Sequence, residues 1–266
     1  MRQQATGTEY LIRHVIDVIR ETYGDDVSVE AKAKDLHKFG RNISVNTGPA
    51  TIMDLGSGET AENYVSTNAI THFASGTDAD TSLSFVVEGH TISGGLLTFA
   101  TQTVTTDASA ARTKTALTTP LARITRAYGV NATTPTGPIY FAEDVTFTNG
   151  VPVAGNTHLI IPAGKNQTRK ASTSLSNQDY WIITNFYADV FEKTAGFAIV
   201  ELQHRQVGSA FREVGVVSAS NTGRGIFPFE PFYIIPKNSD VRLQAETNAD
   251  IDVGGGIHGF LAKVIT

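Results

Sequence analysis

The stretch "EPFYIIPKNSDVRLQAET", residues 230–247, gives the clearest indication of the fold. It starts as an apolar strand, passes through a polar turn at 236–240, and continues as a strand of alternating character. In this second strand Val241, Leu243 and Ala245 are apolar and the residues between them are polar. Successive side chains of a strand point to opposite faces, so the pattern predicts a hairpin with one face in a core.

Similar strand and turn patterns recur from about residue 82 to the end of the chain. They occupy 82–92, 96–106, 117–130, 137–153, 156–172, 179–193, 196–220 and 252–265. An Asn149-Gly150 pair marks a tight turn, and Gln206–Ser209 marks the tip of another hairpin. Roughly seven to ten short strands with no helices between them predict an antiparallel β-sandwich.

The first part of the chain has a different character. The segment "TGTEYLIRHVIDVIRETYG" has apolar residues three and four apart, which predicts an amphipathic helix over 8–23. Its apolar stripe needs a partner, and we expect an assembly interface there; the stripe comprises Leu11, Ile12, Val15 and Ile19. Residues 40–80 lack a sustained period and are expected to form an extended arm with one or two short strands. The predicted organisation is therefore a helix and arm over 1–80 and a β-sandwich over 81–266.

Composition narrows the classes of partner. The net charge is −5 and the basic residues form no cluster, so we expect no direct contact with nucleic acid. There is no cysteine, which excludes disulfides and thiolate metal sites. The start of the chain lacks the apolar segment of a secretion signal, and no run of about 18 apolar residues is present. We expect a protein that is made in a cytoplasm and does not enter a membrane.

Residues with catalytic or ligand-binding chemistry are scattered. No two of the seven histidines have metal-ligand spacing, no nucleophile motif is present, and neither glycine run resembles a phosphate loop. The sequence thus predicts no enzyme and no cofactor. Alternate carboxylates at 78/80 and 250/252 leave calcium open as an alternative to solvated turn residues. Aromatic residues at 180–191 could stack on sugars, although strand period divides them between two faces and favours core packing.

The end of the chain resembles structural proteins of tailed bacteriophages. The resemblance rests on "FYIIPKNSDVRLQAETNADIDVGGGIHGFLAKVI" (232–265), and the segments 94–129 and 196–214 also fit it. In such proteins a proline-ended strand, a polar turn, an alternating strand and a last strand close a jelly-roll-like sandwich. The resemblance covers roughly residues 80–266 and transfers no catalytic residues.

The resemblance implies a non-enzymatic component of a phage particle. It would be a capsid decoration or minor capsid protein, or a head-tail connector, neck or tail accessory. Expected partners are the major capsid, portal, neck or tail proteins of the same particle, and further copies of the chain in a homo-oligomer. The expected location is the virion, after synthesis in the host cytoplasm. The alternative is a receptor- or carbohydrate-binding sandwich of a tail fibre.

Overall fold

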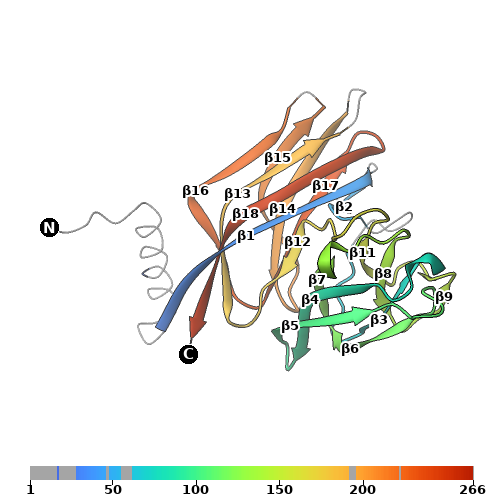
Figure 1. Ribbon diagram of the computed structural model, residues 1–266. Coiled ribbons are helices and arrows are strands. Elements are labelled where there is room, and N and C mark those ends of the chain that lie inside the picture. Colours follow the sequence, from blue (N-terminus) through green and yellow to red (C-terminus); the bar gives the residue numbers. More distant parts are fainter. Residues whose placement is uncertain are drawn as a thin grey trace.

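The computed structural model describes Asp17 and residues 28–45, 48–54, 62–191, 196–221 and 223–265. These ranges are built from antiparallel strands and two short 3-10 turns, η1 (Asp78–Asp80) and η2 (Val130–Ala132), which confirms the all-β prediction. Within them, no helix has the length and apolar character that a membrane span requires. The strands form two lobes (Figure 1).

The first lobe consists of two sheets that face each other. Sheet I has the order β1 (Ser28–Val45), β18 (Ile251–Ile265), β13 (Asp179–Val190) and β16 (Gly225–Ile235). Sheet II has the order β12 (Ser172–Ser174), β17 (Ser239–Thr247), β14 (Phe197–Gln206) and β15 (Arg212–Ser220), and β2 (Ala50–Thr51) also pairs with β17. Trp181 and Ile257 of sheet I share a buried core with Leu202 and Leu243 of sheet II. This lobe is therefore a β-sandwich.

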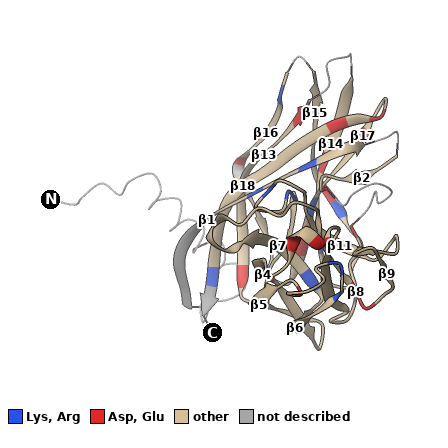
Figure 2. Ribbon diagram, turned by 45° about the vertical axis from the view of Figure 1, so that its right-hand side comes forward, with Lys and Arg blue, Asp and Glu red and all other residues tan. Residues whose placement is uncertain are grey.

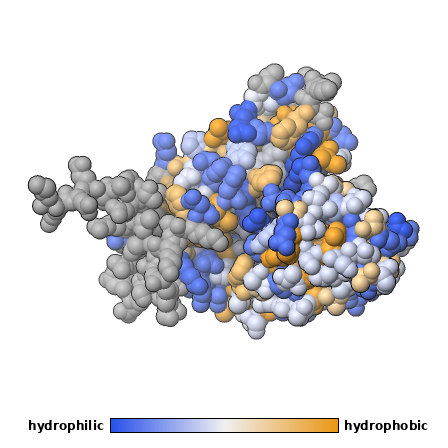
Figure 3. Space-filling model, viewed as in Figure 1, coloured by the Kyte–Doolittle hydropathy of each residue, from blue (hydrophilic) through white to orange (hydrophobic). Residues whose placement is uncertain are grey.

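The second lobe comprises the strands between β2 and β12. One sheet has the order β11 (Thr157–Ile161), β8 (Ile139–Glu143), β3 (Ile70–Ser75) and β6 (Thr115–Leu121). The other has the order β5 (Leu96–Thr105), β4 (Ser84–Ser93) and β7 (Arg123–Gly129), and β9 (Phe147–Thr148) with β10 (Val151–Pro152) form a small hairpin. Phe73, Phe85 and Phe141 lie in a separate core. Figure 3 shows that much of the surface of the second lobe in that view is only weakly polar.

The second lobe is an insertion whose two connections to the first lobe lie side by side. Met53 and Lys170 form a β-bridge where the chain leaves and returns. Asp54 donates its N–H to the carbonyl of Arg169 (3.3 Å), and Ala171 donates to the carbonyl of Ile52 (3.0 Å). Adjacent ends are the usual condition for inserting one domain into another.

The strand alternation around residue 241 is confirmed, but the predicted hairpin is wrong. Val241, Leu243 and Ala245 are all fully buried in the first-lobe core. However, β16 pairs with β13 in sheet I, whereas β17 pairs with β12, β14 and β2 in sheet II. The turn at 236–238 is therefore a corner between sheets. Pro236 lacks a ladder N–H, and Asn238 takes φ 57°, which redirects the chain.

The region from 28 to 80 differs from the expected arm. Strand β1 pairs along β18, β2 joins sheet II, and β3 lies between β8 and β6. The division expected at residue 80 does not correspond to a boundary of either lobe, since residues 81–266 contribute to both. The predicted helix over 8–23 lies outside the described residues apart from Asp17, as do Leu11, Ile12, Val15 and Ile19.

Candidate functional site

The outer face of sheet I carries aromatic and charged side chains in rows. The strand register places Phe39 of β1, Gly256 of β18, Tyr187 of β13 and Ile226 of β16 side by side. The next row contains Arg41, Gly254 and Asp189 in the same strand order. Partners in register project from the same face, so one side of the sheet combines rings and charges over a strand of glycines.

The glycines of β18 allow two aromatic rings to lie against the backbone. A Cβ at Gly254 would come within 2.6 Å of the Phe191 ring, and one at Gly256 within 2.7 Å of the Tyr187 ring. Real side chains do not pack that closely, so a side chain at either position would displace the ring that lies on it. The glycine run at 254–256 thus serves close approach within a strand.

Two arginines stack on these rings and are held by carboxylates. The Arg41 guanidinium lies 4.7 Å from the Phe191 centroid and pairs with Asp252, to which its Nε donates at 2.8 Å. The Arg224 guanidinium lies 4.6 Å from the Tyr187 centroid and donates two hydrogen bonds to Asp189 at 2.7 and 2.9 Å. Hydrogen bonding to these carboxylates raises the pKa of both arginines, so both remain charged.

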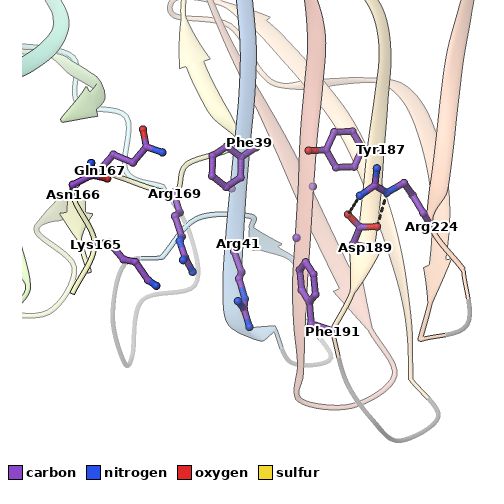
Figure 4. Close-up of a pocket in the computed structure, with 13 residues that line it drawn as sticks. Phe39, Arg41, Lys165, Asn166, Gln167, Arg169, Tyr187, Asp189, Phe191 and Arg224 are labelled. Carbon is purple, nitrogen blue, oxygen red and sulfur yellow. Dashed lines mark hydrogen bonds and ion pairs between the residues drawn. The ribbon is translucent and has the colours of Figure 1, made fainter. Parts of the chain in front are cut away.

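A loop of the second lobe forms the opposite wall. The loop after β11 brings Lys165, Asn166, Gln167 and Arg169 beside Arg41, so that a groove of about 400 Å³ lies between loop and sheet (Figure 4). Among the described residues, neither Lys165 nor Arg169 has a carboxylate within 4.0 Å. Elsewhere Lys and Arg are interspersed with Asp and Glu over both lobes (Figure 2). We name this feature the sheet I groove.

A stacked histidine pair borders the groove. His37 of β1 and His258 of β18 are register partners whose ring centroids lie 3.8 Å apart, and the Tyr187 hydroxyl lies 3.5 Å from His37 Nε2. Burial lowers the pKa of both rings; the neighbouring His258 lowers that of His37 further, and Arg224 that of His258. Protonating both rings would place two cations face to face, so we expect acid to weaken this pairing of the edge strand.

A second cluster of charges joins the lobes and was missed by the sequence analysis. Asp240 of β17 is fully buried and accepts from Arg123 of β7 at 2.8 and 3.1 Å, from Arg205 of β14 at 3.1 Å, and from Ser174 at 2.7 Å. Both guanidinium groups stack on the Tyr64 ring, Arg123 at 5.1 Å and Arg205 at 4.6 Å from its centroid. Burial alone would raise the pKa of Asp240, but hydrogen bonds and charge from Arg123 outweigh it, so the carboxylate stays ionised.

The candidate calcium positions have other roles in the structure. Asp80 is fully buried and accepts from Ser75 Oγ and from the backbone N–H groups of Thr136 and Gly137. Asp252 pairs with Arg41, and Asp250 accepts from Ser44 Oγ. Among the described residues, no three His, Asp or Glu side chains converge as metal ligands. The carboxylates at 78/80 and 250/252 are therefore engaged with protein groups.

The aromatic residues of β13 lie on both faces of the strand, but a register shift between Ile183 and Asn185 breaks the simple period of two. Trp181 and Phe186 are buried in the first-lobe core, and Tyr180 is buried in a separate cluster. Tyr187, and Phe191 just after the strand, line the sheet I groove. The sequence could identify these rings, but it gave no sign that glycines of another strand would lie beneath them.

Acidification is expected to destabilise the protein between pH 6.5 and about 4. Burial lowers the pKa of His90 from 6.5 to about 4. Because this folded pKa lies below the unfolded one, the unfolded chain takes up the proton first, and stability present above pH 6.5 is lost as pH falls toward 4. At about 1.4 kcal/mol per pKa unit, His90 alone accounts for about 3 kcal/mol.

Urea unfolding of the wild type and of His90→Gln across this pH range measures the contribution. The variant should lose less stability than the wild type as the pH falls. Parallel curves for the two proteins would contradict the assignment to His90, while equal stability at pH 7.5 and 4.5 would contradict the prediction altogether.

No family model matches the sequence, and no curated protein matches it. Among solved structures, a chain in a structure of the infectious bursal disease virus Gt strain is similar over 94% of this chain and 77% of that chain, with 12% identity and a TM-score of 0.22. A chain from the Gx strain gives 91% and 73% coverage, 8% identity and a TM-score of 0.21. Scores this low do not establish a common fold, so neither likeness assigns a function.

Proposed function

We propose that the chain is a non-enzymatic structural component of a tailed-phage particle, with a jelly-roll-like first lobe. It would bind neighbouring capsid, neck or tail subunits as a decoration, minor capsid, connector or tail accessory protein, and self-associate. The supporting observation is that the two β-sheet lobes are held together by a buried ionic cluster. A subunit that must fix the spacing of its neighbours needs such a junction, and the resemblance of residues 232–265 to phage structural proteins points the same way.

Further contacts hold the lobes together around that cluster. Asn238, in the corner of the first lobe, accepts from Leu97 N–H at 2.8 Å and donates to the Gly95 carbonyl at 2.9 Å. Lys38 of β1 donates to the Thr125 carbonyl at 3.2 Å, and Lys170 donates to the Ile124 carbonyl at 2.7 Å. These bonds tie the corner and the edge strand of the first lobe, and the connection between the lobes, to the second lobe, which restricts rotation of one lobe against the other.

The N-terminal segment is proposed to bind a neighbouring subunit through Leu11, Ile12, Val15 and Ile19. Since β1 begins at Ser28 and β3 ends at Ser75, removing residues 1–75 would delete strands from both lobes. Removing residues 1–27 keeps every described strand. We expect the 28–266 chain to retain the β-type circular dichroism spectrum of the full chain and to be lost from purified particles.

A variant with Ile12→Asp and Val15→Asp tests the stripe without a deletion, and Arg13→Ala is the matched control on the same segment. Incorporation is measured by the amount of the chain in purified particles, and electron microscopy locates it. Normal incorporation of the 28–266 chain would exclude the segment as the interface. Absence of the full chain from particles would exclude the particle role itself.

A second candidate function, a receptor- or carbohydrate-binding module of a tail fibre, is supported by the sheet I groove. Its exposed rings, glycine floor and cations are the kinds of group that bind small polar ligands. The two functions are compatible, since a particle component can also carry a binding site.

A further inference from the structure

We infer that the sheet I groove binds a saccharide that bears a carboxylate. The inference deepens the carbohydrate-binding candidate and does not depend on the particle role. It rests on three features that come together only in the folded chain. These are stacking surfaces on a glycine floor, cations on the opposite wall that pair with no carboxylate in the described part of the chain, and a carboxylate that can accept from hydroxyl groups.

The stacking surfaces are Phe191 and Tyr187. Phe191 remains 52% exposed although its ring lies against Gly254, so an apolar surface is presented to the groove. A sugar ring has an apolar C–H face, which packs on such a ring, and burying an aromatic face beneath a ligand is favourable. Arg41 and Arg224 stack on the same two rings and thereby limit their rotation.

The cations on the loop supply a site for an anion. Arg41 and Arg224 are neutralised by Asp252 and Asp189, whereas Lys165 and Arg169 are not paired with a carboxylate among the described residues. Guanidinium groups bind carboxylates through two parallel hydrogen bonds, and Lys contributes a point charge. The charge of this wall is therefore available to one carboxylate of a ligand that rests on Phe191.

The remaining polar groups favour a sugar over a nucleic acid. Asp189 lines the groove, and its two oxygens accept one bond each from Arg224, which leaves lone pairs for ligand hydroxyl donors. A groove of about 400 Å³ accommodates one or two sugar rings and not the extended backbone that a cationic nucleic-acid channel follows.

Calorimetric titration of the full chain tests the inference with two acidic probes, trigalacturonate and sialyllactose. Their neutral counterparts are methyl-esterified trigalacturonate and lactose, which retain the rings and lose the charge. At least one acidic probe should bind at least about tenfold more tightly than its neutral counterpart, because a charge-assisted bidentate contact is lost. Raising the salt concentration should weaken that binding.

Matched variants locate the binding. Phe191→Ala and the double variant Lys165→Ala/Arg169→Ala should each weaken binding by about tenfold or more, by loss of stacking and of charge respectively. The controls are Phe197→Ala, an equally exposed ring on sheet II, and Arg212→Ala/Lys237→Ala, two exposed cations outside the groove. Both controls should bind as the wild type does, and unchanged melting curves confirm that all variants are folded.

Several results would overturn the inference. They are no binding of either acidic probe at millimolar concentration, equal binding of acidic and neutral forms, unchanged binding by the groove variants, or tighter binding of a short oligothymidylate. The particle role is tested separately by incorporation. A folded Phe191→Ala chain that still enters particles but no longer binds sugar would separate the two functions.

Discussion

Leu243→Asp is expected to cost several kcal/mol of unfolding free energy and to leave the first lobe unfolded or barely stable. Leu243 is fully buried between the two sheets and is the register partner of Leu202 on β14. The substitution removes a packed side chain, which alone costs about 2–5 kcal/mol, and places a carboxylate in an apolar core. Urea denaturation followed by circular dichroism measures the loss.

Other positions of β17 provide the controls. Glu246 lies on the opposite face and is exposed, so Glu246→Ala should change stability by less than about 0.5 kcal/mol. Arg242 lies 4.0 Å from the Phe211 ring centroid and donates to Gln203, so Arg242→Ala should cost more, about 1 kcal/mol. A stable, well-folded Leu243→Asp protein would place the register one residue away, since a slip of one residue exchanges the two faces.

Turn residues and the alternation of apolar and polar residues predicted the hairpins correctly where the paired strands are neighbours in the sequence. The Asn149-Gly150 turn forms with φ of 52° and 79°, as a tight hairpin requires, and it joins β9 to β10. The hairpin with its tip at Gln206–Ser209 forms between β14 and β15. In both cases the residues that determine the pairing are neighbours in the sequence, so composition and spacing are sufficient.

The corner at 236–238 shows where such reasoning fails. The two strands around it have the composition of a hairpin, but their partners lie elsewhere: Trp181 is the partner of Ile235, and Leu202 that of Leu243. A proline-ended strand followed by a polar turn is compatible with a hairpin and with a change of sheet. The choice is made by packing between sheets, which no local pattern records.

Strand β1 lacks alternation for a related reason. Its outward residues His37, Phe39 and Arg41 line the groove region, and its inward residue Lys38 reaches the second lobe. Neither face of this part of the strand is simply core or solvent, so hydrophobicity has no period of two. The groove could not be predicted for the same reason, because its rings, cations and glycines come from three strands and from segments between strands.

Asp240→Ala is expected to cost about 3–5 kcal/mol, because it leaves the Arg123 guanidinium buried without its carboxylate. The Arg123 side chain is only 5% exposed, and its remaining bonds are to the carbonyls of Val65 and Ala122. Chemical denaturation measures the loss. Asp144→Ala, which breaks an exposed pair with Lys114, is the control and should leave stability almost unchanged because water screens that pair.

A double variant decides whether the cost comes from the unpaired charge of Arg123 or from the lost hydrogen bonds of Arg205 and Ser174. Replacing a buried ion pair by apolar residues of similar size is often neutral, so Arg123→Met with Asp240→Leu should recover much of what Asp240→Ala loses. Arg205 and Ser174 would then lose their acceptor, which limits the recovery. Equal losses in the single and double variants would show that the bonds from Arg205 and Ser174 dominate. Because Arg123 belongs to the second lobe and Asp240 to the first, recovered stability with altered particle incorporation would connect this cluster to the relative placement of the two lobes.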